Sequence, residues 1–267
     1  MTAGYDERRL EAAVRRNGPT RRLEIREEVS STQDLAFTLA EYGAPDGSMI
    51  VADRQTDGRG RLGREWASPA GMGVWASVIL RPPASPPPRP PLLVAATAVA
   101  VAEALERAAG IRTTIRWPND LLVETRKIAG ILVETRDWAP AAPLLVLGVG
   151  INTGQAGEDF APELRDLATS VRIEKGAAPD RTAILVALME ALDRWRASLA
   201  GGAHAAVEEA FADRAAYLGQ EVTLLEGSVL VKGTLVSISA VDGVKLKMAD
   251  GSRRIVKAEH AREMRPV

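Results

Sequence analysis

A stretch of alternating arginine and glycine at residues 58–66 is the part of this chain best suited to chemistry. It reads Gly-Arg-Gly-Arg-Leu-Gly-Arg-Glu-Trp and places three arginines beside three glycines. Glycine lets the backbone move freely, and arginine carries a charge that is fixed at physiological pH. The stretch is poorly suited to a packed core and predicts a loop that binds an anionic ligand.

Three other interpretations of this stretch have to be weighed. Residues 58–63 match the Gly-x-Gly-x-x-Gly fingerprint of dinucleotide-binding folds, which must directly follow a strand and open a helix. The polar residues 54–57 come before it and Pro69 follows closely, so neither condition holds. RNA-binding arginine-glycine segments usually repeat in low-complexity surroundings, whereas this one occurs once. A solvated surface loop without a ligand is the third alternative.

The composition limits the classes of function that are open to the chain. Its 267 residues are 46% hydrophobic, so they can bury a large core, and a net charge of -1 gives no overall attraction to nucleic acid. The absence of cysteine excludes disulfides and thiolate zinc sites and suits a reducing, cytoplasmic environment. The two histidines, His204 and His260, lie far apart in the sequence, so we expect neither a histidine metal site nor a serine triad.

Neither a membrane segment nor a DNA-binding module is predicted. The longest apolar run, residues 92–102, is shorter than the ~20 residues that a membrane-spanning helix needs. Residues 1–22 mix acidic and basic side chains and predict an arm or one short helix. A helix-turn-helix needs two or three packed helices, which these residues cannot supply. We therefore expect no DNA and no membrane among the partners.

Short elements on either side of the arginine loop have to position it. Ser31 and Asp34 stand at capping-box spacing, which predicts a helix that begins after Ser31. Residues 49–52 predict a strand that leads into the loop, and residues 74–80 predict the next strand. Seven of the ten residues at 82–91 are proline, which predicts a stiff extended connector without a site.

The middle of the chain predicts a mixed, largely antiparallel sheet. Residues 92–109 are apolar on nearly all sides and predict a buried central helix. Strand-like segments follow at 113–117, 128–135 and 144–151. The chain between them is too short for helices, which argues against parallel Rossmann winding. Two amphipathic helices are predicted after a loop, at 180–199 and 203–218.

From residue 219 onward the pattern changes to short alternating strands. The pairs Asp242-Gly243 and Asp250-Gly251 are strong signals for hairpin turns. Turns at such regular spacing are typical of small β-barrels. The expected organisation is an N-terminal arm or short helix at 1–22, a large domain at 23–218 and a small barrel at 219–267.

Several polar segments at the ends of these elements are similar, in order and spacing, to the motifs of the biotin protein ligases. The matching segments are Ser-Thr-Gln at 31–33, Gln-Thr-Asp-Gly-Arg-Gly-Arg-Leu-Gly-Arg-Glu-Trp at 55–66, Arg-Trp-Pro-Asn-Asp-Leu at 116–121, Arg-Lys-Ile-Ala-Gly-Ile-Leu-Val-Glu at 126–134 and Gly-Val-Gly-Ile-Asn at 148–152. The resemblance implies an α+β fold of the class II synthetase-like type found in biotin and lipoate ligases. The C-terminal strands resemble the family's small SH3-like β-barrel.

The resemblance implies the ligase activity of that family without a repressor function. Biotin and MgATP would give biotinyl-5′-adenylate and pyrophosphate. A lysine of a biotin carboxyl carrier protein, or of that domain in an acyl-CoA carboxylase, would then accept the biotinyl group. Attack of a carboxylate on an α-phosphate brings two anions together, so the site must supply positive charge. ATP and biotin are the implied ligands, and Mg²⁺ would arrive with ATP rather than on a side-chain cluster.

The resemblance also implies roles for individual residues. Lys127, Arg59 and Arg61 are the expected catalytic residues: Lys127 bridges the biotin carboxylate and the α-phosphate, and the arginines belong to a loop that orders over the intermediate. The expected biotin-binding residues are Ser31, Thr32, Gln33, Gln55, Gly58, Arg59, Gly60, Arg61, Trp66, Lys127, Gly130, Gly148 and Gly150. The expected ATP- or adenylate-binding residues are Arg61, Arg64, Asn119, Asp120, Lys127 and Asn152.

Three positions depart from the family pattern. Gln33 stands where asparagine is common, Leu62 where a basic residue is common, and Arg116 where lysine is common. The role of Asp120 is open, because this carboxylate could order Lys127, bind Mg²⁺ or simply close a turn. Residues 168–178 contain no aromatic side chain on which adenine could stack.

Two other functions are compatible with parts of this pattern. A lipoate or octanoate ligase or transferase has a related fold but lacks the Gly-Arg-Gly-Arg-x-Gly-Arg loop, which favours the biotin ligases. A non-catalytic ligand or RNA binder would keep its function without Lys127, whereas a ligase would lose adenylate formation. The sequence leaves open whether the chain is a monomer or a homodimer.

Overall fold

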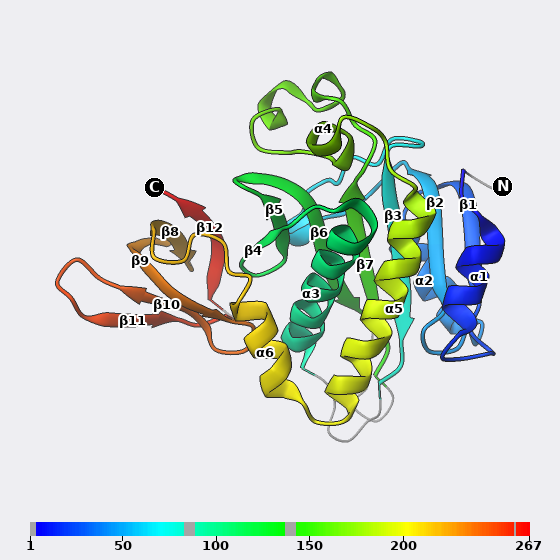
Figure 1. Cartoon of the computed structure of the whole chain (residues 1–267). Coiled ribbons are helices and arrows are strands. Elements are labelled where there is room, and N and C mark those ends of the chain that lie inside the picture. The colour runs from blue at the N-terminus through cyan, green and yellow to red at the C-terminus, as the bar shows by residue number, and fades with distance from the viewer. Residues whose placement is uncertain (1–3, 83–88, 137–142, 259) are drawn as a thin grey trace.

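A seven-stranded mixed sheet lies at the centre of the protein (Figure 1). The computed structural model describes residues 4–82, 89–136, 143–258 and 260–267. In the order β1-β2-β3-β7-β6-β5-β4, the first pair is parallel and every other neighbouring pair is antiparallel. The bounds are Leu23–Val29 for β1, Met49–Gln55 for β2, Gly73–Leu80 for β3, Thr114–Arg116 for β4, Asp120–Val123 for β5, Arg126–Thr135 for β6 and Leu145–Asn152 for β7. The predicted mixed, largely antiparallel α+β fold is confirmed.

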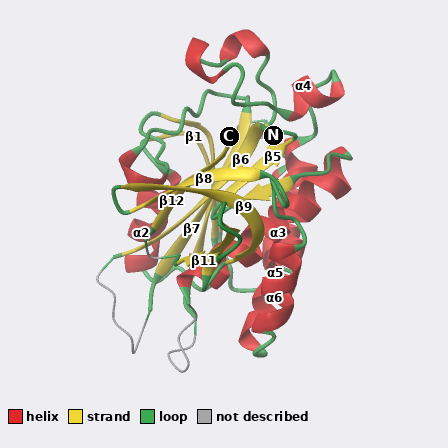
Figure 2. Ribbon diagram, turned by 90° about the vertical axis from the view of Figure 1, so that its left-hand side faces the viewer, coloured by secondary structure: helices red, strands yellow, loops and turns green. Residues whose placement is uncertain are grey.

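Helices cover both faces of this sheet, as Figure 2 shows from the side. Those on one face are α1 (Glu7–Arg15), α3 (Pro90–Ala109) and α5 (Arg181–Ala200), and the helix on the other is α2 (Thr32–Glu41). Side chains alternate along β2 and so serve both layers, with Met49 and Val51 in the larger core and Ile50 packed in the cluster under α2. Among the described residues, no helix is long and apolar enough to cross a membrane.

The central helix α3 is buried because its sequence is apolar on nearly all sides. It begins at Pro90 and Pro91, and proline suits the first helical turn, where the missing N–H has no partner to lose. Gly110 ends the helix in the left-handed conformation, with a φ of 62°. The predicted buried helix is confirmed. The rest of the predicted proline connector, residues 83–88, lies outside the described residues.

The structure differs from the predicted elements at several places. Three strands were not predicted, β1, β5 and β12 (Ala261–Pro266). Helix α6 (His204–Ala212) ends before residue 218, and residues 213–220 form a turning segment instead. The expected loop after β7 contains short helical turns at Gly157–Asp159 and Pro162–Leu164 and the short helix α4 (Val171–Lys175).

The C-terminal residues form a second sheet, which lies beside β4 and α6 (Figure 1). Its five antiparallel strands follow the order β11-β10-β9-β8-β12. Their bounds are Glu221–Glu226 for β8, Val229–Ser239 for β9, Gly243–Lys247 for β10 and Arg253–Val256 for β11. In the described residues β11 and β12 are the two ends of this order and do not pair with each other. The predicted strands are present, but a closed SH3-like barrel is not confirmed.

Candidate active site

A narrow pocket lies between the start of α2, the arginine loop at 58–66 and the middle strands β6 and β7. Its lining contains most of the residues predicted to bind ligand, namely Ser31, Thr32, Gln33, Gln55, Arg59, Gly60, Arg61, Trp66, Asn119, Lys127, Gly130, Gly148 and Gly150. Four other predicted residues, Gly58, Arg64, Asp120 and Asn152, are not part of this lining. The cavity holds about 50 Å³ of free volume, well below the roughly 300 Å³ at which small-molecule pockets usually begin.

The arginine loop is folded as a tight hairpin. The amide of Trp66 donates to the carbonyl of Gly58 at 2.8 Å, and the amide of Gly60 donates to the carbonyl of Arg64 at 2.7 Å. Glycine is required at position 58, since a Cβ there would lie 2.3 Å from the carbonyl oxygen of Trp66. At the exposed tip, Leu62 has a φ of 61°, a conformation that is unfavourable for a residue with a side chain.

Arg59 extends from this hairpin to one carboxylate on α2 and another on β6. Its guanidinium donates to both oxygens of Asp34, at 2.7 and 2.9 Å, and lies 3.4 Å from Glu134. Hydrogen bonds from Arg59, supported by Arg136, outweigh burial and hold the pKa of Asp34 below its ordinary value. Asp34 therefore does not take part in the predicted capping box. Ser31 caps α2 with its hydroxyl, and the Asp34 carboxylate binds the loop.

Arg61 reaches the turn that precedes β5. Its Nη1 donates to Oδ1 of Asn119 at 3.1 Å. The amide nitrogen of Asn119 donates to the carbonyl of Ile131 at 2.8 Å, which fixes the side chain with its oxygen toward the arginine. The hairpin is thus attached to two walls of the pocket, through Arg59 and through Arg61. Arg64 is exposed to solvent.

Lys127 stands at the start of β6 and pairs with Asp120 at the start of β5. The Lys127 Nζ lies 2.5 Å from one oxygen of Asp120, and Arg116 donates to the other at 2.7 Å. Burial acts to raise the pKa of Asp120, but the two neighbouring cations together hold it below its ordinary value. Among the roles left open for Asp120, the structure shows contact with Lys127. Its backbone belongs to strand β5 and not only to the preceding turn.

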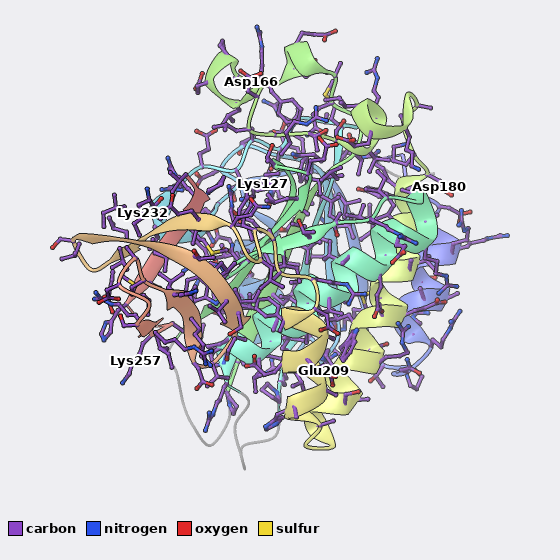
Figure 3. The ribbon with its side chains drawn as sticks, turned by 60° about the vertical axis from the view of Figure 1, so that its left-hand side comes forward. Lys127, Asp166, Asp180, Glu209, Lys232 and Lys257 are labelled. Carbon is purple, nitrogen blue, oxygen red and sulfur yellow. The ribbon has the colours of Figure 1, made fainter. Side chains whose placement is uncertain are left out.

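The backbone of Lys127 is held by the loop that follows β7. Its amide donates to the carbonyl of Leu167 at 2.8 Å, and the amide of Thr169 donates back to the Lys127 carbonyl at 2.9 Å. Figure 3 shows Lys127 beneath this loop, which carries Asp166. Asn152 donates to the carbonyl of Thr169 at 3.1 Å and is buried. In this structure Asn152 therefore supports the loop behind Lys127.

The indole of Trp66 covers the middle of the sheet. Gly130 and Gly150 are cross-strand partners on β6 and β7, and a Cβ on them would lie 2.9 and 2.6 Å from the indole. The Lys127 ammonium lies 4.8 Å from the ring centroid, and the ring of Trp75 packs edge-on at 6.4 Å. The two glycines were predicted to bind biotin, and the absence of a side chain on them leaves room for a ring on this surface. In this structure Trp66 occupies that surface, which accounts for the small free volume.

The part of the pocket at the start of α2 contains several uncharged polar side chains. The amide and hydroxyl of Thr32 donate to the side-chain oxygen of Gln55 at 2.8 and 3.0 Å, and the nitrogen of Gln55 donates to Ser68 at 2.8 Å. Two buried atoms, Oε1 of Gln33 and Nε1 of Trp66, have no hydrogen-bond partner among the described residues. Buried polar atoms are nearly always paired in folded proteins. The unpaired acceptor and donor therefore mark this pocket as a place for a polar ligand.

The charge in the pocket comes from side chains. In the described parts of the chain, no group of three or more histidine, aspartate or glutamate residues could hold a metal ion. The carboxylate of Asp120 is already engaged by two cations. These residues do not fit a magnesium cage of their own. Arg59, Arg61 and Lys127 instead bring positive charge to a pocket that also contains neutral polar side chains, which suits a ligand carboxylate next to a phosphate.

Comparison with known proteins agrees with this geometry. Residues 26–152 match the model of the Biotin/lipoate A/B protein ligase family. A Biotin--[acetyl-CoA-carboxylase] ligase of Paracoccus denitrificans is 34% identical over 234 residues, covering 86% of this chain and 95% of that protein. The chain belongs to the biotin protein ligase family. The Aquifex aeolicus biotin protein ligase solved in complex with biotin and ATP is similar at a TM-score of 0.80 and 30% identity, covering 92% of this chain and 99% of that one.

Other biotin protein ligase relatives are longer than the matching part of this chain. The Bifunctional ligase/repressor BirA of Bacillus spizizenii is 45% identical over 157 residues, which are 59% of this chain and 48% of that protein. The chain thus matches about half the length of this relative. The ligase and repressor functions in that name belong to the Bacillus protein.

Two contacts in this biotin protein ligase family member were missed by sequence reasoning. Asp34 was assigned to a helix cap, and Arg116 was described only as standing where lysine is common, yet they hold Arg59 and Asp120. Asp34 directly follows the motif at 31–33, and Arg116 is the first residue of the motif at 116–121. Pairing each charged neighbour of a motif with an opposite charge in another motif could have found them.

Proposed function

We propose that this chain is an ATP-dependent biotin protein ligase. It forms biotinyl-5′-adenylate from biotin and ATP, and then transfers the biotinyl group to a lysine of a biotin carboxyl carrier domain of an acyl-CoA carboxylase. The observation that carries the proposal is that Lys127, Arg59 and Arg61 line one pocket together with the uncharged polar side chains of Thr32, Gln33 and Gln55. Similarity to a ligase solved with biotin and ATP supports it.

The polar end of the pocket suits the ureido ring of biotin. That ring presents N–H donors and a carbonyl acceptor, so its site must offer both kinds of partner. Gln33 provides a buried acceptor that lacks a protein partner, and Thr32 and Gln55 contribute hydroxyl and amide groups. The dithiolane ring of lipoate has no hydrogen-bond donors and would leave these groups unmatched, which strongly disfavours binding.

The first step joins two anions at the charged end. An oxygen of the biotin carboxylate bonds to the α-phosphorus of ATP, and the bond from that phosphorus to the pyrophosphate oxygen breaks. The Lys127 ammonium, aimed by Asp120, lies against both anions and stabilises the charge that develops between them. Arg59 and Arg61 bind oxygens of the carboxylate and phosphate. Magnesium would be held mainly by the phosphates, and the roles of these three cationic side chains do not depend on it.

Ligand binding has to move Trp66 or the hairpin, because the free volume is about 50 Å³. Trp66 is the one aromatic side chain in the described pocket lining, so we assign it to stacking against the adenine base. The hairpin then closes over the mixed anhydride and excludes water, which would otherwise hydrolyse it.

The second step needs access for a protein substrate. The carrier lysine attacks the acyl carbon of the adenylate, its nitrogen bonds to that carbon, and AMP leaves. We assign residues 23–218 to the catalytic domain and residues 219–267 to a small SH3-like barrel. The second sheet lies beside β4, so it borders the side of the active site that carries Asp120.

Biotin-dependent exchange of labelled pyrophosphate into ATP tests this function. Purified protein with Mg²⁺ should catalyse exchange with biotin, and biotin should then appear on a carboxyl carrier domain. No exchange in the presence of biotin would rule out the proposal. Exchange with lipoate in place of biotin would assign the chain to the lipoate ligases instead.

A further inference from the structure

A short return arm, residues 67–72, leads from the arginine hairpin back into β3. The amide of Met72 donates to the carbonyl of Pro69 at 3.4 Å, and Gly71 between them has a φ of 74°. A positive φ at the third position of such a turn favours glycine. The indole N–H of Trp75 on β3 donates to the same Pro69 carbonyl at 3.3 Å. The return arm is therefore an ordered turn that is tied to β3.

The end of the return arm is bonded to the segment that follows β7. The carbonyl of Met72 accepts from the amides of Thr153 and Gly154, at 3.0 and 2.7 Å, and from the hydroxyl of Thr153 at 3.0 Å. Thr153 is fully buried and directly follows Asn152 in the sequence. The base of the hairpin and the end of β7 are therefore held together.

The next carbonyl, that of Gly73, accepts two hydrogen bonds from residues far away in the sequence. Tyr5 donates through its hydroxyl at 3.2 Å, and Arg181 donates through Nη1 at 3.2 Å. The same nitrogen of Arg181 lies 2.8 Å from Asp53 on β2, and the guanidinium carbon lies 4.5 Å from the centre of the Tyr5 ring. Tyr5 is completely buried, and the side chains of Arg181 and Asp53 are 11% and 19% exposed. Hydrogen bonds in such shielded surroundings are costly to break.

Residues 4–9 reach this position because they are held against the start of α5. The amide of Asp6 donates to the hydroxyl of Thr182 at 3.0 Å. The guanidinium of Arg9 pairs with the carboxylate of Asp180 at 2.8 Å. These contacts fix the segment along the helix, so its buried tyrosine is held against the first residue of β3.

The two sides of the hairpin are attached in different ways. Arg59 and Arg61 bind the pocket walls through their side chains, and the pair of Arg59 with Asp34 is partly exposed. The return arm is attached through hydrogen bonds to the carbonyls of Met72 and Gly73. Partly exposed ion pairs exchange partners easily, whereas buried hydrogen bonds do not. A hairpin that moves when ligand enters therefore releases its arginine contacts first and turns about the return arm.

We propose that Tyr5 and Arg181 are positioning residues for the arginine hairpin. They fix the Gly73 carbonyl, and with it the return arm, so that the hairpin closes from a fixed base and retains the adenylate between the two steps. This inference rests on the proposed ligase function and deepens it. It gives residues 4–9 a part in retaining the intermediate, although none of them belongs to the described pocket lining.

The rate at which biotinyl-adenylate leaves the protein tests the proposal. Protein loaded with biotin and ATP is separated from free ligand, and released adenylate is followed by labelling of lysines on an added bystander protein. Tyr5→Phe keeps the buried ring and removes its bond to Gly73, so release should be about fivefold faster, the effect of losing one hydrogen bond. Arg181→Lys keeps a positive charge on a shorter side chain, which should withdraw from Gly73 with a similar effect. The double variant removes both donors, so release should be about 50-fold faster, more than the product of the single effects.

Two other variants of α5 serve as matched controls. Arg194→Lys makes the same change at a guanidinium that is 61% exposed and paired with Glu103. Ile184→Val shortens a fully buried side chain, which lowers stability about as much as losing a hydrogen bond. Both should release adenylate at the wild-type rate. Pyrophosphate exchange should stay within about twofold of the wild-type rate in every variant, because no side chain that lines the pocket changes.

The outcomes separate this inference from the ligase function. Wild-type release in the double variant, or an equal rise in Ile184→Val, would overturn the positioning roles while the ligase assignment stands. A loss of pyrophosphate exchange that parallels faster release would also overturn them, by showing general damage to the site. If the double variant does not fold, Tyr5→Phe decides alone, and wild-type release in it overturns the proposal. Absence of biotin-dependent exchange in the wild-type protein would overturn the ligase function itself, and the inference with it.

Discussion

The two sides of the pocket hold their cations in different ways. Arg59 lies on a surface hairpin and pairs with Asp34 on a helix, and the two side chains are 29% and 35% exposed. Lys127 lies in a ladder of strands and pairs with Asp120, which is 16% exposed and also bound by Arg116. Exposed ion pairs contribute little and exchange partners easily, whereas breaking a shielded pair leaves a charge uncompensated. Because Asp34 is more exposed than Asp120, we expect the loop side to exchange partners more readily than the strand side.

Removing the positive charge of Lys127 should have the largest effect on catalysis. Lys127→Met keeps the length of the side chain and should lower kcat for adenylate formation about 1000-fold, because the charge acts where negative charge develops. Pyrophosphate exchange measures this. Asp120 keeps Arg116 as a partner, so thermal unfolding should change little. Lys232→Met is the matched control, since Lys232 lies on the C-terminal sheet away from Lys127 (Figure 3). A loss within tenfold would show that Lys127 is not central to the reaction.

The place of the Trp66 indole can be tested from the strand beneath it. Gly150→Ala puts a methyl group where the closest indole atom is 2.6 Å away, so the ring has to leave the sheet. We expect the KM for ATP to rise about tenfold, since overpacking a fitted contact costs roughly 1–3 kcal/mol. Tryptophan fluorescence reports the ring movement. Gly157→Ala, which meets nothing within 4 Å, is the control. Unchanged fluorescence and KM would mean that the indole position is not needed for nucleotide binding.

The elements that the sequence predicted well are those whose pattern is local. The central helix α3 could be predicted because its residues are apolar on nearly all sides. The turns Asp242-Gly243 and Asp250-Gly251 separate strands as expected. Strand β1 was missed because it is a short edge strand in which the alternation of Leu23 and Ile25 with charged residues stops at Glu27 and Glu28. The short strand β5 begins within turn-like residues and exists because β4 and β6 pair with it on both sides.

The candidate site was predictable as a set of residues and not as a set of contacts. The resemblance to the biotin protein ligases, carried over residue by residue, named most of the pocket lining. Local rules assigned Asp34 to its own helix, but a guanidinium that reaches it from another motif is a stronger partner than a backbone amide. Likewise, Gly130 and Gly150 indicate that a group packs closely against the strands. Their local sequence does not show whether that group is a ligand or Trp66.

Neutralising Asp34, the partner of Arg59 on α2, should make Arg59 more available to a ligand. Asp34→Asn keeps the shape of the side chain but removes the charge that competes with a ligand carboxylate. We expect the Kd for biotin to fall about threefold, in keeping with a partly exposed pair. Isothermal titration calorimetry measures it, with Asp46→Asn as a control on a carboxylate bound to Arg196 elsewhere. Weaker binding would show that Asp34 positions Arg59 for the ligand rather than competing for it.

The pair of Arg59 and Asp34 makes the stability of the hairpin depend on pH. The folded pKa of Asp34 is lowered, so its contribution to stability is present above the unfolded pKa of about 3.9 and is lost as the pH falls through the lower, folded value. Hydrogen exchange of the Gly60 amide, corrected for intrinsic rates, should therefore be constant between about pH 5 and 8. A change in protection inside that range would mean that another group controls the hairpin.

The smallest expected effect concerns the tip of the hairpin, where Leu62 adopts a φ of 61° and a ψ of 32°. Leucine in this conformation is strained by about 1–2 kcal/mol, whereas asparagine adopts it more readily because its short polar side chain bonds locally. Leu62→Asn should therefore slow exchange of the Gly60 amide a few-fold and leave kcat within about twofold, since Leu62 is 55% exposed and outside the pocket lining. If kcat falls together with the rate of hydrogen exchange, opening of the hairpin limits turnover. The strain at Leu62 would then serve to keep the hairpin mobile.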